Sequence, residues 1–335
     1  MAASTGAIVL AAGKGTRMKS TQAKVLHSVF YRPMLRHVLD AALGAAVERI
    51  AVVIGHQQEA VQAILADLPV ETVLQEEQRG TGHAVLCAEA ACAGLDQILI
   101  LCGDTPLIRT ETLTAMLAQH RQEQPALTLM TTTLPQPFGY GRILRSKQGE
   151  VQAIVEEKDA SAEERAIDEI NAGIYVVDAA FLFAALAQVG TDNSQGEIYL
   201  TDIVAIARRE SKRVQAFAHQ QAMDVLGVNS RIELAQAEAA LQERRNLDLM
   251  RAGVSMFCPK TTRVAPGCTI GQDCILHGQV SIEGESSLGP NCVVEQGVVL
   301  RDCRLGEAVR IGANSVLVGR HVMDGAEIAP LSRNL

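Results

Sequence analysis

The last third of the chain repeats an apolar residue every six positions. The repeat runs without a slip from residue 264 to residue 300, and its register then moves by one. An α-helix has a period of about 3.6 residues and a half-buried strand has a period of about 2, so neither element explains this spacing. A β-helix does, because each six-residue unit forms one flat side and turns one apolar side chain inward. The recurring residues are Val264, Ile270, Leu276, Ile282, Leu288, Val294 and Leu300, then Leu305, Ile311, Val316, Val322 and Ile328.

Three sides of this kind complete one coil before the pattern returns to the same side. The spacing therefore predicts that Cys274 and Cys292 stack on adjacent coils. Each coil can bury its apolar side chains only by stacking on its neighbours, so the repeats must fold together.

The first two thirds of the chain follow another pattern. From residue 7 to about residue 228, short β-branched runs alternate with helical segments, which is typical of a mostly parallel sheet covered by helices. The expected strands are residues 7–12, 49–55, 70–75, 97–104, 127–133 and 173–178, and the clearest helical segments are 33–45 and 81–94. Residues 230–250 lack glycine and proline and predict a long connecting helix. We therefore divide the chain into an α/β domain (1–229), a linker helix (230–252) and a β-helix (253–335).

Charge and composition exclude several classes of protein. The formal charge is −8 and the isoelectric point is about 5.6, whereas proteins that bind nucleic acids or membrane surfaces usually present a basic face. No apolar stretch approaches the roughly 20 residues that a membrane span needs, and the amino terminus does not have the pattern of a secretion signal. We expect a cytoplasmic protein.

The eight cysteines do not form a recognisable metal or redox motif. No Cys-x-x-Cys pair occurs, which argues against a zinc site or a dithiol. In a cytoplasmic protein we expect them to be small buried residues. They are Cys87, Cys92, Cys102, Cys258, Cys268, Cys274, Cys292 and Cys303.

The first strand runs into a glycine-rich, basic loop, Gly13-Lys14-Gly15-Thr16-Arg17. The spacing matches neither the P-loop nor the dinucleotide fingerprint. Glycines nevertheless let backbone N–H groups approach an anion closely, and the loop follows a strand end where ligands bind in open α/β sheets. On these residues alone, a phosphate loop and a surface turn with incidental cations remain equal alternatives.

The longer segment Leu10–Met18, "LAAGKGTRM", resembles the signature of the sugar-nucleotide pyrophosphorylases, to which the downstream Lys24 also belongs. That family usually has proline before this lysine, where the present chain has Ala23. Further segments, including "QEEQRGTGHAV" (75–85), "CGDTPLI" (102–108), "IVEEKDA" (154–160) and "GVNSR" (227–231), resemble the bifunctional N-acetylglucosamine-1-phosphate uridylyltransferase/glucosamine-1-phosphate acetyltransferase family over almost the whole chain. The resemblance implies a nucleotidyltransferase (Rossmann-like) domain, a long helix and a left-handed β-helix that forms a homotrimer.

The resemblance also implies a reaction and its residues. UTP and N-acetylglucosamine 1-phosphate would give UDP-N-acetylglucosamine, a precursor of the cell wall, and pyrophosphate, by in-line attack on the α-phosphate with Mg²⁺ as cofactor. Arg17 and Lys24 would be catalytic, and Asp104 and Asn229 would bind the metal. The nucleotide would contact Leu10, Ala11, Ala12, Gly13, Gln75, Gly80 and Thr81. The sugar side would comprise Cys102, Gly103, Gly141, Glu156, Asn171 and Asn229.

Several alternatives stay open at this stage. Asp104 could instead cap the turn after its strand, Lys24 and Glu156 could be solvated surface charges, and Gly80-Thr81 could be a glycine turn with a threonine N-cap. We interpret His83 as structural. Cys102 stands where the family usually has an aromatic residue and Ala172 where it usually has threonine, so a pyrophosphorylase for another sugar or nucleotide is an alternative. A non-catalytic scaffold is another.

The second activity of that family is expected to be absent. Its acetyltransferase residues lie on β-helix coils that have no counterpart in this sequence, which ends in early coils. We therefore expect a truncated β-helix and no acetyl transfer.

Overall fold

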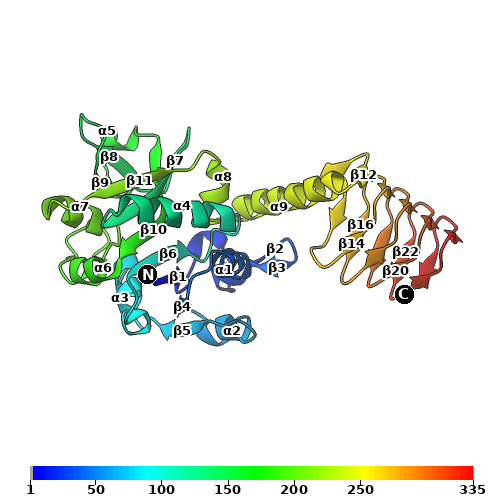
Figure 1. The fold of residues 1–335 in the computed structure, drawn as a ribbon, viewed down its shortest axis with the longest axis horizontal. Coiled ribbons are helices and arrows are strands. Elements are labelled where there is room, and N and C mark those ends of the chain that lie inside the picture. The colour runs from blue at the N-terminus through cyan, green and yellow to red at the C-terminus, as the bar shows by residue number, and fades with distance from the viewer. Residues whose placement is uncertain (1–2, 335) are drawn as a thin grey trace. The chain divides into compact units, whose positions relative to one another are not determined.

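The computed structural model describes residues 3–334 (Figure 1). Its internal contacts divide the chain into two units. One comprises the residues up to Ser28 together with Arg32–Leu234, and the other comprises Val29–Tyr31 and the residues from Ala235 onward.

A nine-stranded sheet forms the centre of the described part of the first unit. Its main path runs β11-β7-β10-β6-β1-β4-β5, and β8 and β9 extend it from β10. All pairs on the main path are parallel except those of β10, which runs antiparallel to β6 and β7. The strands are β1 (Thr5–Leu10), β4 (Arg49–Ile54), β5 (Glu71–Leu74), β6 (Gln97–Cys102), β7 (Leu127–Thr133), β8 (Arg142–Arg145), β9 (Val151–Val155), β10 (Glu169–Asp178) and β11 (Val214–Ala218).

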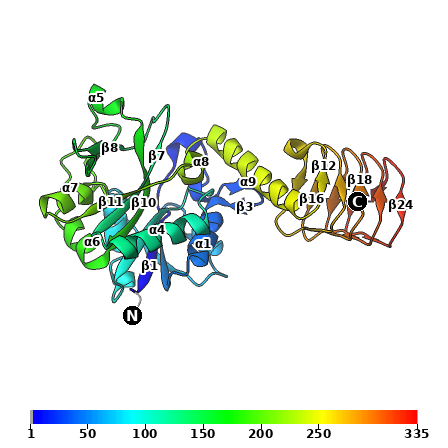
Figure 2. The ribbon, with the colours of Figure 1, turned by 45° about the horizontal axis from the view of Figure 1, so that its top comes forward.

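Helices cover both faces of this sheet (Figure 2). Successive residues of β1 point to opposite faces, so Ile8 packs with one apolar cluster while Ala7 and Val9 pack with the other. One face is covered by α1 (Met34–Gly44) and α4 (Thr110–Glu123), and the other by α3 (Thr81–Cys87), α6 (Ala179–Leu186) and α7 (Asp202–Arg209). Burial on both sides explains the continuous apolar strands, and the predicted mostly parallel sheet is confirmed.

Several short elements accompany the sheet and its covering helices. The helices α2, α5 and α8 span Gln58–Ala63, Ala162–Arg165 and Ala222–Val225. Single 3₁₀ turns occur at Thr16–Met18, Lys24–Leu26 and Ala90–Cys92, and β2 (Ser28–Val29) pairs with β3 (Arg32–Pro33).

The single helix expected over residues 81–94 is wrong in its second half. The helix α3 ends at Cys87, and a separate 3₁₀ turn follows at Ala90–Cys92. Gly94 then takes a positive φ of 81°, which turns the chain toward β6. The alanine-rich sequence favours helix throughout, so its composition did not reveal this break.

The helix α9 spans Arg231–Arg251 and carries the chain toward the β-helix. Near its carboxyl end, Asn246 Nδ2 donates to the carbonyl oxygens of Pro259 and Thr262, each at 2.8 Å, and Gln242 Nε2 donates to Lys260 O at 2.9 Å. These side chains satisfy the backbone of the segment that enters the first coil. None of the helices formed by residues 3–334 combines the length and apolar composition needed to cross a bilayer.

Short parallel strands stack into three narrow sheets in the second unit. The predicted pairing of coils is confirmed: Ile275 pairs with Val293, and Ile275 N donates to Cys292 O at 2.8 Å, so Cys274 and Cys292 occupy equivalent places on adjacent coils. The first strand of one of these sheets is β12 (Ser255–Met256), and a 3₁₀ turn follows it at Pro259–Thr261. The other strands of the three sheets are β13 (Arg263–Val264), β14 (Thr269–Ile270), β15 (Ile275–Leu276), β16 (Ser281–Glu283), β17 (Ser287–Leu288), β18 (Val293–Val294), β19 (Val299–Arg301), β20 (Arg304–Leu305), β21 (Arg310–Ile311), β22 (Val316–Val318), β23 (His321–Val322), β24 (Glu327–Ile328) and β25 (Arg333–Asn334).

One inward residue of the repeat was assigned wrongly. Leu317 pairs with Leu300 and is only 4% exposed, whereas Val316 is half-buried and pairs with Val299. The six-residue spacing therefore continues to Leu317. The spacing between inward residues falls from six to five at the same corner of two successive coils, after Leu300 and after Leu317. A five-residue side at a corner leaves the inward stacking intact, so the sequence period alone could not locate the second slip.

The cysteines are not all buried, contrary to the prediction. Within residues 3–334 all eight have free thiols, and Cys258 is exposed while Cys87 and Cys102 are half-buried. The other five are buried, four of them inside the β-helix.

Replacing Leu300 with alanine should destabilise the β-helix strongly. Leu300 is 0% exposed in the coil interior, and a cavity there is expected to cost about 2–5 kcal/mol of unfolding free energy. Leu331 in the same unit is 67% exposed, so Leu331→Ala is a matched control expected to change stability by less than about 0.5 kcal/mol. Amide hydrogen exchange in the coils measures both, and equal effects would contradict the assigned interior.

Candidate active site

A pocket of about 700 Å³ opens at the carboxyl ends of β1 and β6. These two strands lie next to each other, with Leu10 opposite Cys102, so the loops that follow them meet at the same edge of the sheet. Predicted nucleotide, catalytic, sugar and metal residues line this pocket together. The lining includes Leu10, Ala11, Ala12, Gly13, Lys24, Gln75, Gly80, Thr81, Cys102 and Asp104.

The glycine-rich loop presents main-chain donors to this pocket. The N–H groups of Gly13, Lys14 and Gly15 donate to no acceptor within residues 3–334. Gly15 has a positive φ of 64°, and a Cβ at this position would come within 2.5 Å of Lys24 Cβ. Glycine therefore allows both the turn and the close approach of the loop to Lys24. Free N–H groups of this kind suit a phosphate group.

Four side chains from distant parts of the sequence form one polar network beside the loop. The Lys24 ammonium pairs with the Asp104 carboxylate, and it also donates to Asn229 Oδ1 at 3.0 Å. Arg17 donates to the same Asn229 oxygen at 2.8 Å. Lys24 and Asp104 are both mostly buried, with about one sixth of each side chain exposed (15% and 16%). The network brings together two cations, one carboxylate and one amide. Lys24 and Asp104 line the pocket, whereas Arg17 and Asn229 join it through hydrogen bonds and are not lining residues.

The segment after α8 holds Asn229 in this network. Val228 N donates to Asp104 O at 2.8 Å, and Asn229 N donates to Glu233 Oε2 at 2.5 Å. A Cβ at Gly227 would lie 3.2 Å from an Asp104 carboxylate oxygen, so only glycine fits there without displacing the carboxylate. The backbone thus fixes the relation between Asp104 and Asn229.

Gln75 and Gly80 form another wall of the pocket. Gln75 is 3% exposed, and its Nε2 donates to Gly80 O at 3.2 Å and lies 3.0 Å from His83 Nδ1. Thr81 is not the N-cap of α3, because Gly80 takes that position, and Thr81 Oγ1 instead accepts from Leu200 N at 3.1 Å. His83 contacts Gln75 and is not among the residues that line the pocket.

The remaining sugar-side residues gather behind Cys102. Cys102 Sγ donates to Gly173 O at 3.4 Å, and Gly173 N donates to Asn171 Oδ1 at 3.1 Å. Asn171 N in turn donates to Gly141 O at 2.9 Å, and a Cβ at Gly141 would lie 3.6 Å from the Glu156 carboxylate. Gly103 N donates to Leu10 O at 2.9 Å, which links the residue after β6 to the end of β1.

Burial keeps two groups in this region closer to neutral than they are in water. It raises the pKa of the Cys102 thiol to about 12, helped by the nearby Asp104 charge, so the thiol stays protonated at neutral pH. Burial also raises the pKa of Glu156, and a hydrogen bond of 3.2 Å from Thr201 Oγ1 opposes this shift. Cys102 is therefore not a thiolate nucleophile.

Sequence analysis missed several residues of this region. Val25, Gln78, Ala84 and Glu197 also line the pocket, together with Lys14, Gly15 and Thr16 of the glycine-rich loop that the sequence had already indicated. Thr201 holds Glu156, and the buried Tyr175 accepts a hydrogen bond of 2.7 Å from Asn171 Nδ2. Glu197 and Thr201 belong to the segment "GEIYLTD" (196–202), whose polar residues among apolar ones were the available signal.

Comparisons with known proteins show the family and the fold of this chain. Residues 7–169 match the family of MobA-like NTP transferase domains. The chain is similar to a crystal structure of UDP-glucose pyrophosphorylase complexed with UDP-glucose, with a TM-score of 0.59 over 72% of this chain and 100% of that chain. The identity to that protein is 19%, so this likeness supports the fold.

Two relatives share far more of the sequence. The chain is 48% identical over 317 residues to the bifunctional protein GlmU of Syntrophotalea carbinolica, covering 94% of this chain and 68% of that protein. It is also 48% identical over 313 residues to the bifunctional protein GlmU of Desulfotalea psychrophila, covering 93% of this chain and 92% of that protein. The resemblance inferred from the motifs is thereby confirmed. The chain belongs to the family of bifunctional GlmU proteins and is a nucleotidyltransferase.

Proposed function

We propose that the pocket at the ends of β1 and β6 is where this uridylyltransferase joins UTP to N-acetylglucosamine 1-phosphate. A phosphate oxygen of the sugar phosphate attacks the α-phosphorus of UTP, and the bond from this phosphorus to the bridging oxygen of the β-phosphate breaks. The products are UDP-N-acetylglucosamine and pyrophosphate. The observation that carries this proposal is the network of Lys24, Asp104, Asn229 and Arg17 beside the open N–H groups of the glycine loop.

The chemistry of the substrates explains why the network consists of charges and amides. The attacking phosphate oxygen is already ionised at neutral pH, so no general base is needed. The chain must instead hold two polyanions in line and offset the charge that develops during attack. Free backbone N–H groups at residues 13–15 would hold the triphosphate, while Arg17 and Lys24 would stabilise the transition state.

The residues present fit a magnesium ion. Asp104 and Asn229 already direct oxygen atoms at a common cation, the Lys24 ammonium, and carboxylate and amide oxygens are ligands that Mg²⁺ accepts. Residues 3–334 contain no cluster of three or more His, Cys, Asp or Glu side chains placed for a metal. Two protein ligands suit magnesium, which usually keeps waters and substrate phosphates as its other ligands. When bound, the ion would neutralise phosphate charge.

The other walls of the pocket suit the base and the sugar. Gln75 would meet the uracil edge through its Oε1 acceptor, since its Nε2 is directed at Gly80 O and His83 Nδ1. Leu10, Ala11, Ala12, Gly80 and Thr81 would complete the nucleoside site. Gly103, Gly141, Glu156, Asn171 and Asn229 would hold the sugar phosphate. Cys102 is smaller than the aromatic residue usual in the family and would leave more room there.

We propose the remaining assignments on the basis of family membership. They are a nucleotidyltransferase domain over residues 1–229, a linker helix over 230–252 and a β-helix over 253–335 that is left-handed and forms a homotrimer, in a cytoplasmic protein. The stacked parallel strands of the second unit and the acidic composition support them.

Replacing Asp104 with alanine should abolish turnover, because the variant loses a metal ligand and leaves the Lys24 ammonium without its carboxylate partner. Pyrophosphate release from UTP and N-acetylglucosamine 1-phosphate, measured with and without magnesium, tests this. Asp192→Ala changes an exposed carboxylate and serves as the matched control with unchanged activity. Magnesium-dependent turnover by the Asp104 variant at the level of the control would contradict the assignment.

A substrate panel tests the identity of the base and the sugar. UTP with N-acetylglucosamine 1-phosphate should give the highest kcat/KM among the common nucleoside triphosphates and sugar 1-phosphates, because Gln75 suits uracil and the sugar-side residues suit an N-acetyl group. A higher kcat/KM with another pair would assign a different pyrophosphorylase, and no pyrophosphate from any pair would favour a scaffold.

The expected lack of acetyltransferase activity stays a prediction for the chain as given. The purified protein should not transfer the acetyl group of acetyl-CoA to glucosamine 1-phosphate, since the residues of that site have no counterpart in its sequence. Free CoA release above a protein-free control would contradict this, with the uridylyl assay showing that the preparation is active.

A further inference from the structure

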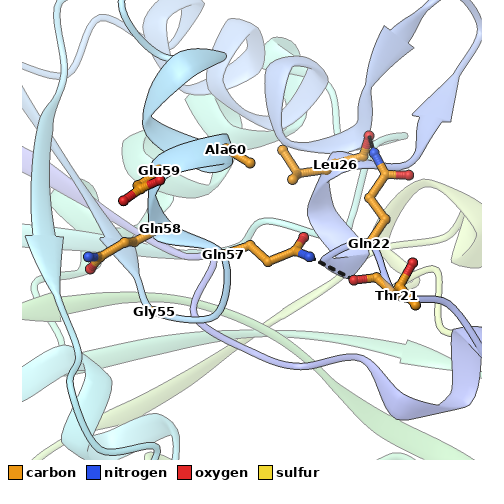
Figure 3. A pocket seen from close by; sticks show the side chains of 8 residues that line it. All are labelled: Thr21, Gln22, Leu26, Gly55, Gln57, Gln58, Glu59 and Ala60. Carbon is orange, nitrogen blue, oxygen red and sulfur yellow. Dashed lines mark hydrogen bonds between the residues drawn. The ribbon is translucent and has the colours of Figure 1, made fainter.

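The Gln57 side chain binds the backbone on both sides of Gln22, directly before Lys24 (Figure 3). Its Nε2 donates to Thr21 O at 2.7 Å, and its Oε1 accepts from Ala23 N at 2.7 Å. Thr21, Gln22 and Leu26 line one side of a cavity there, and the start of α2 lines the other. Gln57 reaches across this cavity toward Thr21, while Gln58 points away. A single carboxamide therefore clamps the segment with one donor and one acceptor.

Ala23 has the backbone shape of a proline without its ring. Its φ is −56° and its ψ is 138°, within the range that a pyrrolidine ring imposes. Ala23 is 0% exposed, so its N–H has no access to water and depends on Gln57 for a hydrogen bond. A proline at this place, as is usual in the resembled family, has no N–H and needs no such partner.

The conformation of Ala23 sets the position of Lys24. Ala23 is the N-cap of the 3₁₀ turn Lys24–Leu26, and its carbonyl accepts from Leu26 N at 3.0 Å. The Lys24 side chain leaves this turn directly toward Asp104 and Asn229. Rotation about the Ala23 backbone would move the ammonium away from the network.

Gln57 adopts a backbone conformation that glycine would favour. Its φ is 56° and its ψ is 42°, which is the left-handed region. A residue with a long side chain is uncommon there unless the surrounding contacts offset the strain. The two hydrogen bonds across the cavity provide those contacts, so the side chain at this position has a reason to be present.

We propose that Gln57 is a positioning residue for Lys24, and that its carboxamide fixes Ala23 as the ring of a proline would. The two positions form a coupled pair: glutamine at 57 suits a residue with an N–H at 23, and proline at 23 suits glycine at 57. The inference rests on the catalytic role of Lys24 in the proposed function.

Gln57→Gly removes the clamp and relieves the backbone strain, so the variant should fold. Misplacing a catalytic group by about 1 Å can cost on the order of 100-fold in rate. Asp104 and Asn229 still bind the ammonium in this variant, so we expect a smaller loss, of roughly 10-fold in kcat. KM for N-acetylglucosamine 1-phosphate should stay within about threefold, since a group that acts in the transition state affects kcat more than binding. Gln58→Ala alters the same cavity without touching the clamp and is the matched control. An unchanged kcat in Gln57→Gly would overturn the proposal.

A double-mutant cycle with Ala23→Pro separates positioning from general stability. Ala23→Pro alone should lower kcat, because it removes the N–H and brings a ring carbon against Gln57 Oε1. The combined Ala23→Pro, Gln57→Gly variant should recover kcat to within about threefold of the parent, so that the two effects are far from additive. Additive losses would overturn the coupling. Gln57→Asn, which tolerates the left-handed region but is one methylene shorter, should repeat the loss if the glycine variant proves unstable on thermal melting.

The same assay with Lys24→Met distinguishes this inference from the proposed function. Lys24→Met should lose turnover, and adding Gln57→Gly to it should change kcat no further, because Gln57 acts through Lys24. Full activity in Lys24→Met would overturn the proposed function. A large loss in Lys24→Met together with a further loss on adding Gln57→Gly would overturn only the role of Gln57.

Discussion

The contact between the Lys24 ammonium and the Asp104 carboxylate organises the candidate site. It joins the turn after β1 to the end of β6, and Asn229 adds the segment before α9 through a hydrogen bond of 3.0 Å to Lys24. A mostly buried charge pair of this kind contributes little net stability, but removal of either partner leaves the other uncompensated. The contact matters because it fixes positions: it holds a cation, a carboxylate and, through Asn229, an amide close together beside the pocket.

The chemistry of the site follows from that arrangement. In the proposed reaction two polyanionic substrates must be brought together, so open backbone N–H groups, Arg17 and Lys24 would be more useful than a nucleophile or a base. Burial holds the Cys102 thiol protonated, with a pKa of about 12, and this residue accordingly acts as surface rather than as a reactive group. In the proposed reaction the position of Lys24 matters most, and the proposed role of Gln57 is to fix that position through Ala23.

Much of the architecture could be predicted from local sequence periods. The six-residue repeat predicted the β-helix, because one side chain of each flat side must point inward. Continuous apolar runs predicted the central strands, because both faces of the sheet are covered by helices. The errors fell where the local sequence does not mark the change of structure. Leu317 rather than Val316 faces inward after a shortened corner, and α3 ends at Cys87 within a run that favours helix. The motifs identified many of the residues that line the pocket. The hydrogen bond between Gln57 and Ala23 joins residues 34 positions apart, and no sequence motif indicates it.

A crystal structure of the chain with UTP and magnesium tests the central claim most directly. The account predicts the triphosphate against the N–H groups of the loop beginning at Gly13, close to Arg17, with the uracil beside Gln75 and the metal held by Asp104 and Asn229. A triphosphate bound elsewhere on the first unit would contradict the account.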